Sequence, residues 1–464
     1  MQSDEARRQR GHAPLRGLVP KAASVLKRRD ATSMTLLSRR RAQPIVRGTL
    51  VGARHRIAET AIARVFMGIL LVRASLDPIL GEGRIEFIGG SISPGAAFNV
   101  IIPGITIAMA LRRPRAVTWL DAAPWLLLLG LCGVLSIGSP DLGQSLRILL
   151  VLVTYACVCM LPILLARTAA DVRRLLDVVL LSATVPCAVG LVQIAANMGD
   201  AEYRVHATFT HANIFAFYIV AMLAVVLIRL EDALYCDGAW RRRALIVCVF
   251  VLGAELFMTK TRSAWFAAAL LIASHAVLIN RRYLPAMLLL AIAAVAVPGV
   301  RERLMDATSA AEYIGNGVVL NSFEWRRQLW SDAWPWIMDA PLLGNGGLGT
   351  FFHYSSRFFS IGQEPVYAHS VYVQLGFEVG LLGPVIFFGL LSHTACRVFL
   401  RYRAQQPAAA IIATTLCVAY LAVAYSDNML GYLSFNWYFF TIIGCLVALT
   451  RMRHAAMIGV GSGR

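Results

Sequence analysis

The chain has 464 residues, of which 58% are hydrophobic and only 15% are charged, and its mean hydropathy is +0.64. Apolar runs of about twenty residues recur along most of it, which excludes an ordinary soluble globular protein and predicts membrane-spanning helices. The formal charge of +18 comes from a basic N-terminal stretch and from short clusters between the apolar runs. This pattern indicates membrane topology, and we expect no nucleic-acid partner.

In chain order, residues 1–56 are predicted to be a basic, disordered arm that stays in the cytoplasm and contacts anionic membrane lipid. Residues 57–464 are predicted to form a transmembrane domain. The expected fold class is all-α, a polytopic membrane helix bundle of about twelve transmembrane helices. The apolar runs place these helices at residues 57–76, 95–111, 121–138, 145–166, 174–197, 212–230, 243–259, 262–280, 283–299, 372–396, 407–426 and 431–450.

Arginine clusters fall on alternate connections between these runs. Examples are the pair Arg112 and Arg113 and the triplet at residues 241–243. The clusters share a side with the basic N-terminal arm. By the positive-inside rule, both termini are therefore predicted to lie in the cytoplasm.

A long polar segment, residues 300–371, separates the predicted ninth and tenth helices, and the helix count places it in the periplasm. Its many Trp and Phe residues argue against disorder, so short helices at the membrane surface are predicted, one of them over Phe323–Met338. The run Gly344–Gly349 lacks the lysine of a phosphate-binding loop and follows no strand. We interpret it as a tight backbone turn.

Polar residues predicted to face the periplasm gather at four places in the sequence. They are Arg204, His206, His211 and Asn213; Lys260, Arg262 and Ser263; Glu324, Arg326, Arg327 and Trp330; and His369, Ser370 and Tyr372.

Arg262 falls in the first turn of a predicted helix, with Lys260 just before it. A helix N-terminus carries a partial positive charge, so two cations there are unfavourable unless an anion binds. The arrangement therefore predicts a phosphate or pyrophosphate pocket, which Arg326 and Arg327 would close from the loop. The alternatives are that Lys260 and Arg262 extend to lipid phosphates and that Arg326 and Arg327 form a solvated helix face.

His369 would lie near these cations, which disfavour its protonated form and lower its pKa. A neutral imidazole near pH 7 is suited to act as a general base.

Taken together, these segments resemble the O-antigen ligase and Wzy-type polymerase superfamily of bacterial membrane glycosyltransferases. The matching pieces are Phe209-Thr-His211-Ala-Asn213, Thr259-Lys-Thr-Arg262-Ser-Ala-Trp265, Arg326-Arg-Gln-Leu-Trp330, Asp339-Ala-Pro-Leu-Leu-Gly344-Asn-Gly346 and His369-Ser-Val-Tyr372 with Gly376-Phe-Glu378-Val-Gly380-Leu-Leu-Gly383. Ser370 stands where the family usually has Asn, and Ala212 stands where it usually has Pro.

The resemblance implies an inverting, metal-independent glycosyltransferase that needs no cofactor. It implies His369, Arg262 and Arg326 as catalytic residues, with Arg326 preferred to its neighbour Arg327 because it precedes Trp330 by one helical turn. The residues expected to bind substrate are Lys260, Arg327, His211, Asn213, Arg204 and Trp330.

The implied donor is a glycan on undecaprenyl pyrophosphate, used at the periplasmic face of the bacterial inner membrane. A polymerase would join lipid-linked repeat units into exopolysaccharide or O-antigen and would work with a chain-length regulator. A ligase would transfer the glycan to the lipid A core. The pattern over Tyr425–Tyr438 favours the polymerase. A lipid-linked glycan transporter is the alternative of another class.

Overall fold

The structure is a computed structural model, and it describes residues 60–82, 85–87, 90–92, 94–200, 203–232, 239–285, 287–289, 312–314, 317–319, 322–361, 364–404 and 406–461. All of these belong to one compact unit, Ala58–Arg464. The predicted arm at residues 1–56 and most of the predicted helix at 283–299 lie outside the described residues.

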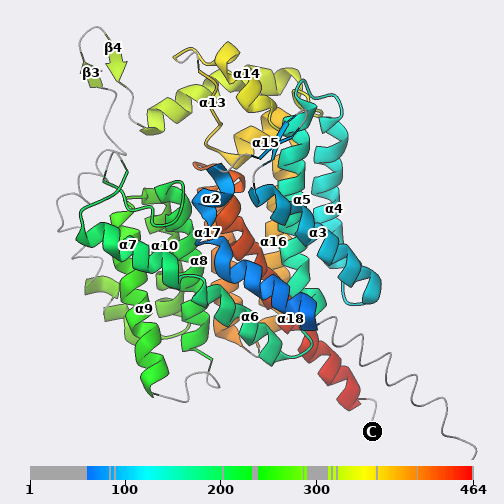
Figure 1. Cartoon of the computed structure of the whole chain (residues 1–464), viewed down its shortest axis with the longest axis vertical. Helices are drawn as coiled ribbons and strands as arrows, with labels where there is room; N and C mark the ends of the chain where they lie inside the picture. Colours follow the sequence, from blue (N-terminus) through cyan, green and yellow to red (C-terminus); the bar gives the residue numbers. More distant parts are fainter. Residues whose placement is uncertain are drawn as a thin grey trace, which may run out of the picture. The chain divides into compact units, whose positions relative to one another are not determined.

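Long helices make up most of the described chain (Figure 1). They follow a helical segment at residues 60–73 and are α3 (Pro94–Arg112), α4 (Trp119–Ser136), α5 (Leu142–Leu165), α6 (Ala169–Leu181), α7 (Thr184–Ala195), α8 (Ala212–Leu230), α9 (Ala239–Met258), α10 (Arg262–Leu278), α16 (Leu382–Tyr402), α17 (Pro407–Val423) and α18 (Leu433–Gly461).

Shorter elements connect these helices. They are α2 (Asp77–Glu82), α13 (Ser322–Asp339), α14 (Thr350–Phe358), α15 (Val371–Val379), the 3-10 turns η1 (Arg281–Tyr283) and η2 (Met429–Gly431), and two antiparallel hairpins, β1 (Ile85–Phe87) with β2 (Gly90–Ile92) and β3 (Glu312–Ile314) with β4 (Gly317–Val319).

Within the described residues, seven helical stretches are long and apolar enough to cross a membrane: α3, α4, α5, α6 with α7, α8, α16 and α18 as far as Met452. Two shorter apolar helices, α10 and α17, lie beside them. The expected helical membrane protein is therefore confirmed, with the small hairpins as an addition. The total of about twelve spans and the position of the large loop between helices nine and ten stay predictions.

Two predicted helices are broken in the structure. The run 174–197 forms α6 and α7, because Pro186 has no N–H to donate to the carbonyl of residue 182. The run 372–396 forms α15 and α16, because Gly380 adopts a left-handed φ of 76° at the end of α15. Both breaks lie inside runs that look continuous by hydropathy alone.

Helix α18 is the centre of the bundle. It packs against α5, α8, α6 and α16 (Figure 1), and its residues Trp437, Tyr438, Phe439 and Phe440 are all buried. A Cβ atom at Gly444 would overlap the carbonyl oxygen of Cys159 on α5. This glycine therefore allows the two backbones to approach closely, as small residues do between membrane helices.

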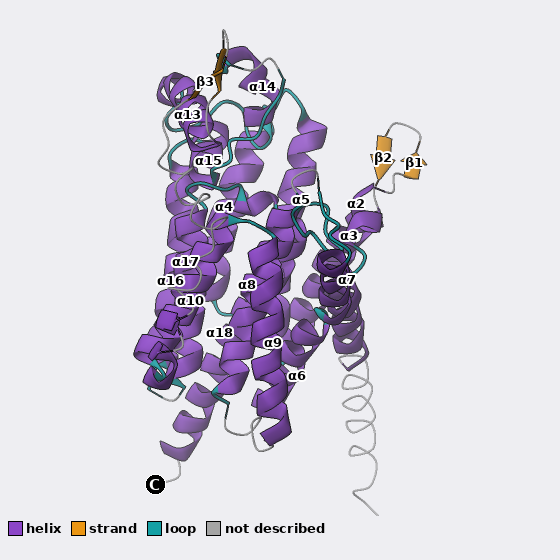
Figure 2. Ribbon diagram, turned by 90° about the vertical axis from the view of Figure 1, so that its left-hand side faces the viewer, coloured by secondary structure: helices purple, strands orange, loops and turns teal. Residues whose placement is uncertain are grey.

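The large polar segment contributes helices that pack at one end of the bundle, where α13, α14 and α15 lie together (Figure 2). The predicted helix over Phe323–Met338 is confirmed as α13, and its position at the membrane surface stays a prediction. These helices share a second apolar cluster that includes Leu329, Phe351 and Phe377. The predicted tight turn is also confirmed, since Gly344, Gly346, Gly347 and Gly349 all have positive φ.

Replacing Gly444 by Ala should lower the stability of the bundle by about 1–3 kcal/mol, because the added methyl group forces α5 and α18 apart. The thermal unfolding temperature of the purified protein in detergent measures this. Gly389→Ala on α16 is the matched control, since a Cβ there meets nothing within 4 Å. Equal unfolding temperatures for the two variants would contradict the close approach.

Candidate functional site

A cavity of about 790 Å³ lies where α5, α8, α15 and α18 begin, with α13 and the loop around η2 completing its wall. Arg204, His211, Asn213, Arg326 and His369, all predicted to belong to the site, line this cavity. The structure thus brings together residues from three of the four polar segments. Lys260, Arg262, Arg327 and Trp330 do not line it.

His369 sits directly before α15 in a loop that several contacts hold in place. Its φ is 50°, a left-handed conformation that is unfavourable for a residue other than glycine. Trp330 donates an indole N–H to the carbonyl of Ala368 at 2.7 Å. The amide of Val371 donates to the Ala424 carbonyl at 2.9 Å. Trp330 therefore supports the loop that carries His369 and is not part of the cavity wall.

The imidazole of His369 is neutral at neutral pH. Burial, and after it the charges of Arg326 and His211, together lower its pKa from 6.5 to about 4. The ring of Trp325 meets it edge-on, with centroids 5.6 Å apart. A neutral histidine beside an arginine is an arrangement that can accept a proton from a bound hydroxyl.

Arg326 and Arg327 face different surroundings although they are neighbours on α13. Arg326 lines the cavity and donates from Nη1 to the carbonyl of Ser426. Within the part of the chain that the structure describes, it makes no ion pair. The Arg327 side chain is 71% exposed and pairs with Glu324 at 3.5 Å. Only Arg326 therefore directs its charge toward the cavity.

A buried carboxylate, that of Asp427, connects the elements around the cavity. Its oxygens accept hydrogen bonds from the Tyr432 hydroxyl, from Ser263 Oγ at 3.2 Å and from the Asn428 amide at 3.0 Å. Burial raises the pKa of Asp427, while the Tyr432 hydroxyl and the Arg326 charge oppose that shift. One side chain thus joins the start of α10 to the loop before α18.

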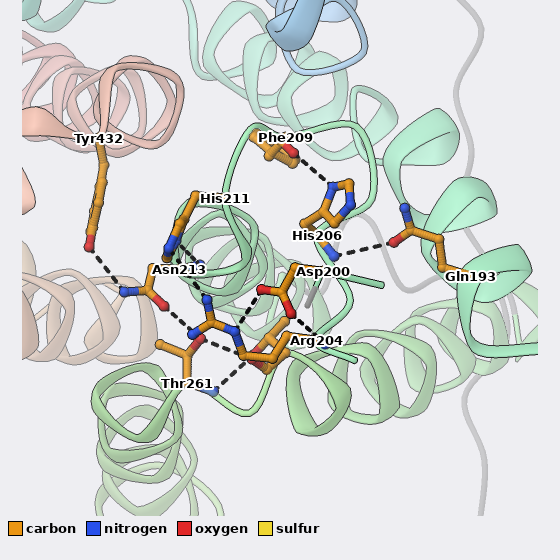
Figure 3. A network of polar contacts seen from close by, with 10 residues as sticks. Gln193, Asp200, Arg204, His206, Phe209, His211, Asn213, Thr261 and Tyr432 are labelled. Carbon is orange, nitrogen blue, oxygen red and sulfur yellow. Dashed lines mark hydrogen bonds and ion pairs between the residues drawn. The ribbon is translucent and has the colours of Figure 1, made fainter. Parts of the chain in front are cut away.

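The start of α10 is held at the cavity wall by the residues on both sides of Arg262. Ser263 bonds Asp427, and Thr261 Oγ1 donates to Asn213 Oδ1 at 3.1 Å. Asn213 in turn donates to the Tyr432 hydroxyl at 3.2 Å (Figure 3). Lys260 has a φ of 52° and precedes this turn. The structure therefore sets Arg262 between two residues that contact the cavity wall, although its own side chain is not part of the lining.

Arg204 and His211 lie beside each other at the start of α8 (Figure 3). Arg204 Nε pairs with Asp200 at 2.8 Å, and its Nη2 is 3.4 Å from His211 Nε2. His211 Nδ1 accepts the Asn213 amide at 3.1 Å and caps α8, so in the neutral ring the proton lies on Nε2. Arg204 Nη2 and His211 Nε2 are then two donors that lie side by side, which suits an acceptor such as a phosphate oxygen.

Several cavity residues were not singled out in the sequence. Gln144 and Arg147 of α5 line it, as do Asn428 and Tyr432. Arg147 was overlooked because it lies inside an apolar run counted only as a membrane span. An arginine within such a run is itself a signal of function.

Strained backbone gathers in the connections at this end of the bundle. The described residues other than glycine with positive φ are Asn197, Tyr203, Ala207, Lys260 and His369. All lie between α7 and α8, directly before α10 or directly before α15. Residues in such conformations persist only where surrounding contacts determine them, and they are common at functional sites.

Among the described residues, no group of three or more His, Cys, Asp or Glu side chains is placed to hold a metal ion. The cations that line the cavity are Arg147, Arg204 and Arg326, and the carboxyl group of Glu378 lies in the same lining.

The fold and the cavity define an integral membrane protein with a cavity at one end of its helix bundle, whose lining includes arginine and histidine side chains. Residues 246–388 match the sequence model of a family described as O-antigen ligase. The matched segment runs from α9 into α16 and contains Arg262, Arg326 and His369. The resemblance to the O-antigen ligase and Wzy-type superfamily is thereby confirmed. No curated protein matches the chain.

Replacing Asp427 by Asn should destabilise the cavity end of the bundle by about 1–3 kcal/mol, because an amide cannot accept all the bonds that the buried carboxylate accepts. Thermal unfolding with Trp fluorescence measures the change. Asp141→Asn is the matched control, since Asp141 is an exposed helix cap and Asn caps a helix equally well. If Asp427→Asn unfolds at the control's temperature, Asp427 does not connect these elements.

Proposed function

We propose that this protein transfers a glycan from undecaprenyl pyrophosphate to an acceptor hydroxyl, and that it polymerises lipid-linked oligosaccharide repeat units into surface polysaccharide. The observation that carries the proposal is the pairing of a neutral histidine, His369, with an arginine, Arg326, on the wall of one cavity. The family match supports a function in polysaccharide ligation or polymerisation.

In the proposed reaction the donor's pyrophosphate binds in the cavity beside Arg326 and Arg204, with Arg262 and Lys260 contributing from the start of α10. The acceptor hydroxyl attacks the anomeric carbon from the face opposite the leaving group, so the configuration inverts. As the new C–O bond forms, His369 takes the hydroxyl proton. The bond from the anomeric carbon to the pyrophosphate oxygen breaks, and the pyrophosphate leaves with the electron pair. The arginines stabilise the charge that develops there.

The low pKa of His369 is compatible with its role as the base. The charge of Arg326 opposes protonation of the imidazole. A bound pyrophosphate offsets that positive charge and raises the basicity of the imidazole. His369 would therefore become an effective base only when the donor is in place.

The remaining predicted residues have supporting roles in this proposal. His211 and Asn213 shape the start of α8, and Trp330 fixes the loop before His369. Arg327, which pairs with Glu324 on an exposed face, would at most meet an outer part of the glycan.

The proposed setting is the bacterial inner membrane, with both termini in the cytoplasm and the cavity open to the periplasm. The positive-inside pattern of the arginine clusters supports this orientation. A chain-length regulator and membrane lipid are the proposed partners.

A second candidate function is O-antigen ligation, in which the acceptor is the lipid A core. The description of the matching family favours it. The resemblance of Tyr425–Tyr438 to members that assemble exopolysaccharide favours polymerisation. The bond-making chemistry is the same in both.

His369→Ala should abolish product when it is expressed in a deletion strain, because no other group would take the hydroxyl proton. The measurements are lipopolysaccharide ladders, secreted polysaccharide and undecaprenyl-pyrophosphate-linked intermediates. Single lipid-linked repeat units accumulate if the protein is a polymerase. Long lipid-linked chains beside unmodified lipid A core accumulate if it is a ligase.

The matched control is His353→Ala, which removes an exposed histidine of α14 outside the cavity lining. It should complement the deletion fully. If His369→Ala also complements fully at normal expression, His369 is not the base and a lipid-linked glycan transporter becomes the leading reading.

The pH dependence of transfer should reflect the lowered pKa of His369. The base works only when neutral, so kcat/KM for the donor should stay constant on acidification until the pH approaches about 4, and then fall. Arg326→Gln should move this inflection to higher pH in the residual activity, because it removes a charge that opposes protonation. Arg327→Gln should leave the inflection in place. An inflection near the ordinary histidine value in the wild type would contradict the assignment.

A further inference from the structure

A second, smaller cavity of about 340 Å³ adjoins the first at the same end of the bundle. It lies among α2, α3, α5 and the starts of α8 and α18. The two cavities share the wall residues Arg147, Val151, Ile214, Gly431 and Leu433. A molecule in one cavity is therefore next to a molecule in the other.

Two charged groups of the second cavity are buried and neutralise each other. Arg73 and Asp77, 3% and 7% exposed, form an ion pair at 2.9 Å, and Ser434 Oγ donates to Asp77. Asn99 is only 6% exposed and lines the cavity, yet its Oδ1 has no hydrogen-bond partner among the residues that the structure describes. A buried amide oxygen without a partner costs stability, so a ligand that donates a hydrogen bond to it would recover that cost.

The two cavities differ in the ligand chemistry that they suit. The first has the cationic residues Arg204 and Arg326, which suit the donor's pyrophosphate. In the second, Asp77 neutralises Arg73, and the remaining cation of the lining, Arg147, lies on the wall shared with the first cavity. The neighbouring amide and hydroxyl groups of the second cavity match the hydroxyls of an uncharged sugar, and Leu80, Ala96 and Leu150 offer apolar surface to a sugar ring.

Arg147 stands on the wall shared by the two cavities. It has no ion pair or hydrogen bond to any residue that the structure describes. Its guanidinium can therefore contact the donor's phosphate on one side and an acceptor sugar on the other. This placement would keep the two substrates adjacent.

We propose that the second cavity is the acceptor subsite, which binds the terminal, uncharged sugar of the acceptor through Asn99 and Ser434 and directs its hydroxyl toward the first cavity past Arg147. This inference rests on the proposed function, because it assigns the second of the two substrates. It holds for a polymerase and for a ligase, since in both the attacking hydroxyl belongs to a sugar.

The test uses the full-length protein in detergent with the lipid extract of a deletion strain, which supplies donor and acceptor. Two products are measured: glycan joined to the acceptor, and free glycan released when water attacks the anomeric carbon instead. In the second reaction the bond to the pyrophosphate breaks, a bond to the water oxygen forms, and the water proton goes to His369. Only the first reaction needs the acceptor.

Asn99→Leu and Ser434→Ala should each lower transfer about fivefold, the factor expected for one lost hydrogen bond, and should leave release of free glycan unchanged or raised. A larger amount of extract should restore transfer, because the defect lies in acceptor binding. The control is Thr106→Val, also on α3, whose hydroxyl bonds the Ile102 carbonyl at 2.8 Å and lines neither cavity. It should leave both products unchanged.

Unchanged transfer in both variants would overturn the acceptor subsite, and so would an equal fall of both products, which would indicate a defect in donor use. Ser434→Ala removes only one oxygen atom and is therefore less prone to misfold than Asn99→Leu. If the wild-type protein forms neither product, the proposed function itself fails, and that result is distinct from any difference between variants.

Discussion

The cavity depends on one buried carboxylate, that of Asp427, which is 2% exposed. A charged group in such a place is stable only when its oxygens are fully hydrogen-bonded, and Tyr432, Ser263 and the Asn428 amide meet that demand. Because these donors come from two helix starts and one loop, satisfying the carboxylate also fixes the cavity wall. Arg326 adds its charge nearby and bonds the preceding residue's carbonyl.

The opposite ends of the same helices are fixed by a different kind of contact. Asp121 at the start of α4 pairs with Arg397 of α16 at 2.6 Å and with Arg451 of α18. Arg229 near the end of α8 pairs with Asp177 of α6. Each pair has one almost fully buried partner, and breaking the pair would leave that charge uncompensated, so these ends resist movement. Ion pairs thus hold the helices together at one end of the bundle. At the other end, hydrogen-bonded loops form the cavity wall.

The sequence predicted most of the membrane helices because hydropathy depends on composition, which needs no knowledge of neighbours. It did not predict the interruptions at Pro186 and Gly380, since both residues are tolerated inside membrane helices and only packing decides. The polar segments at Arg204, Arg326 and His369 could be picked out in advance, because charged and titratable groups flank apolar runs.

The contacts that these polar segments make were harder to predict from the sequence. Whether Arg326 or Arg327 faces inward depends on the rotation of α13, which a motif does not specify. The connection between Ser263 and Asp427 spans 164 positions of the chain. The second cavity, which Asn99 lines, requires α3 to lie beside α5, and no local sequence pattern predicts that contact.

The position of α18 in the chain has a consequence for biosynthesis. It is the most buried of the candidate spans, with 89% of its apolar window inside the protein, yet the ribosome makes it after α5, α8 and α16, which surround it. Those helices enter the lipid bilayer before their central partner exists. During this interval the faces that later contact Trp437 and Phe440 must be covered by lipid or by one another. Helix α18 therefore inserts among helices that are already in the membrane, and the cavity, whose wall includes Tyr432 and Leu433, can form only at or after that step.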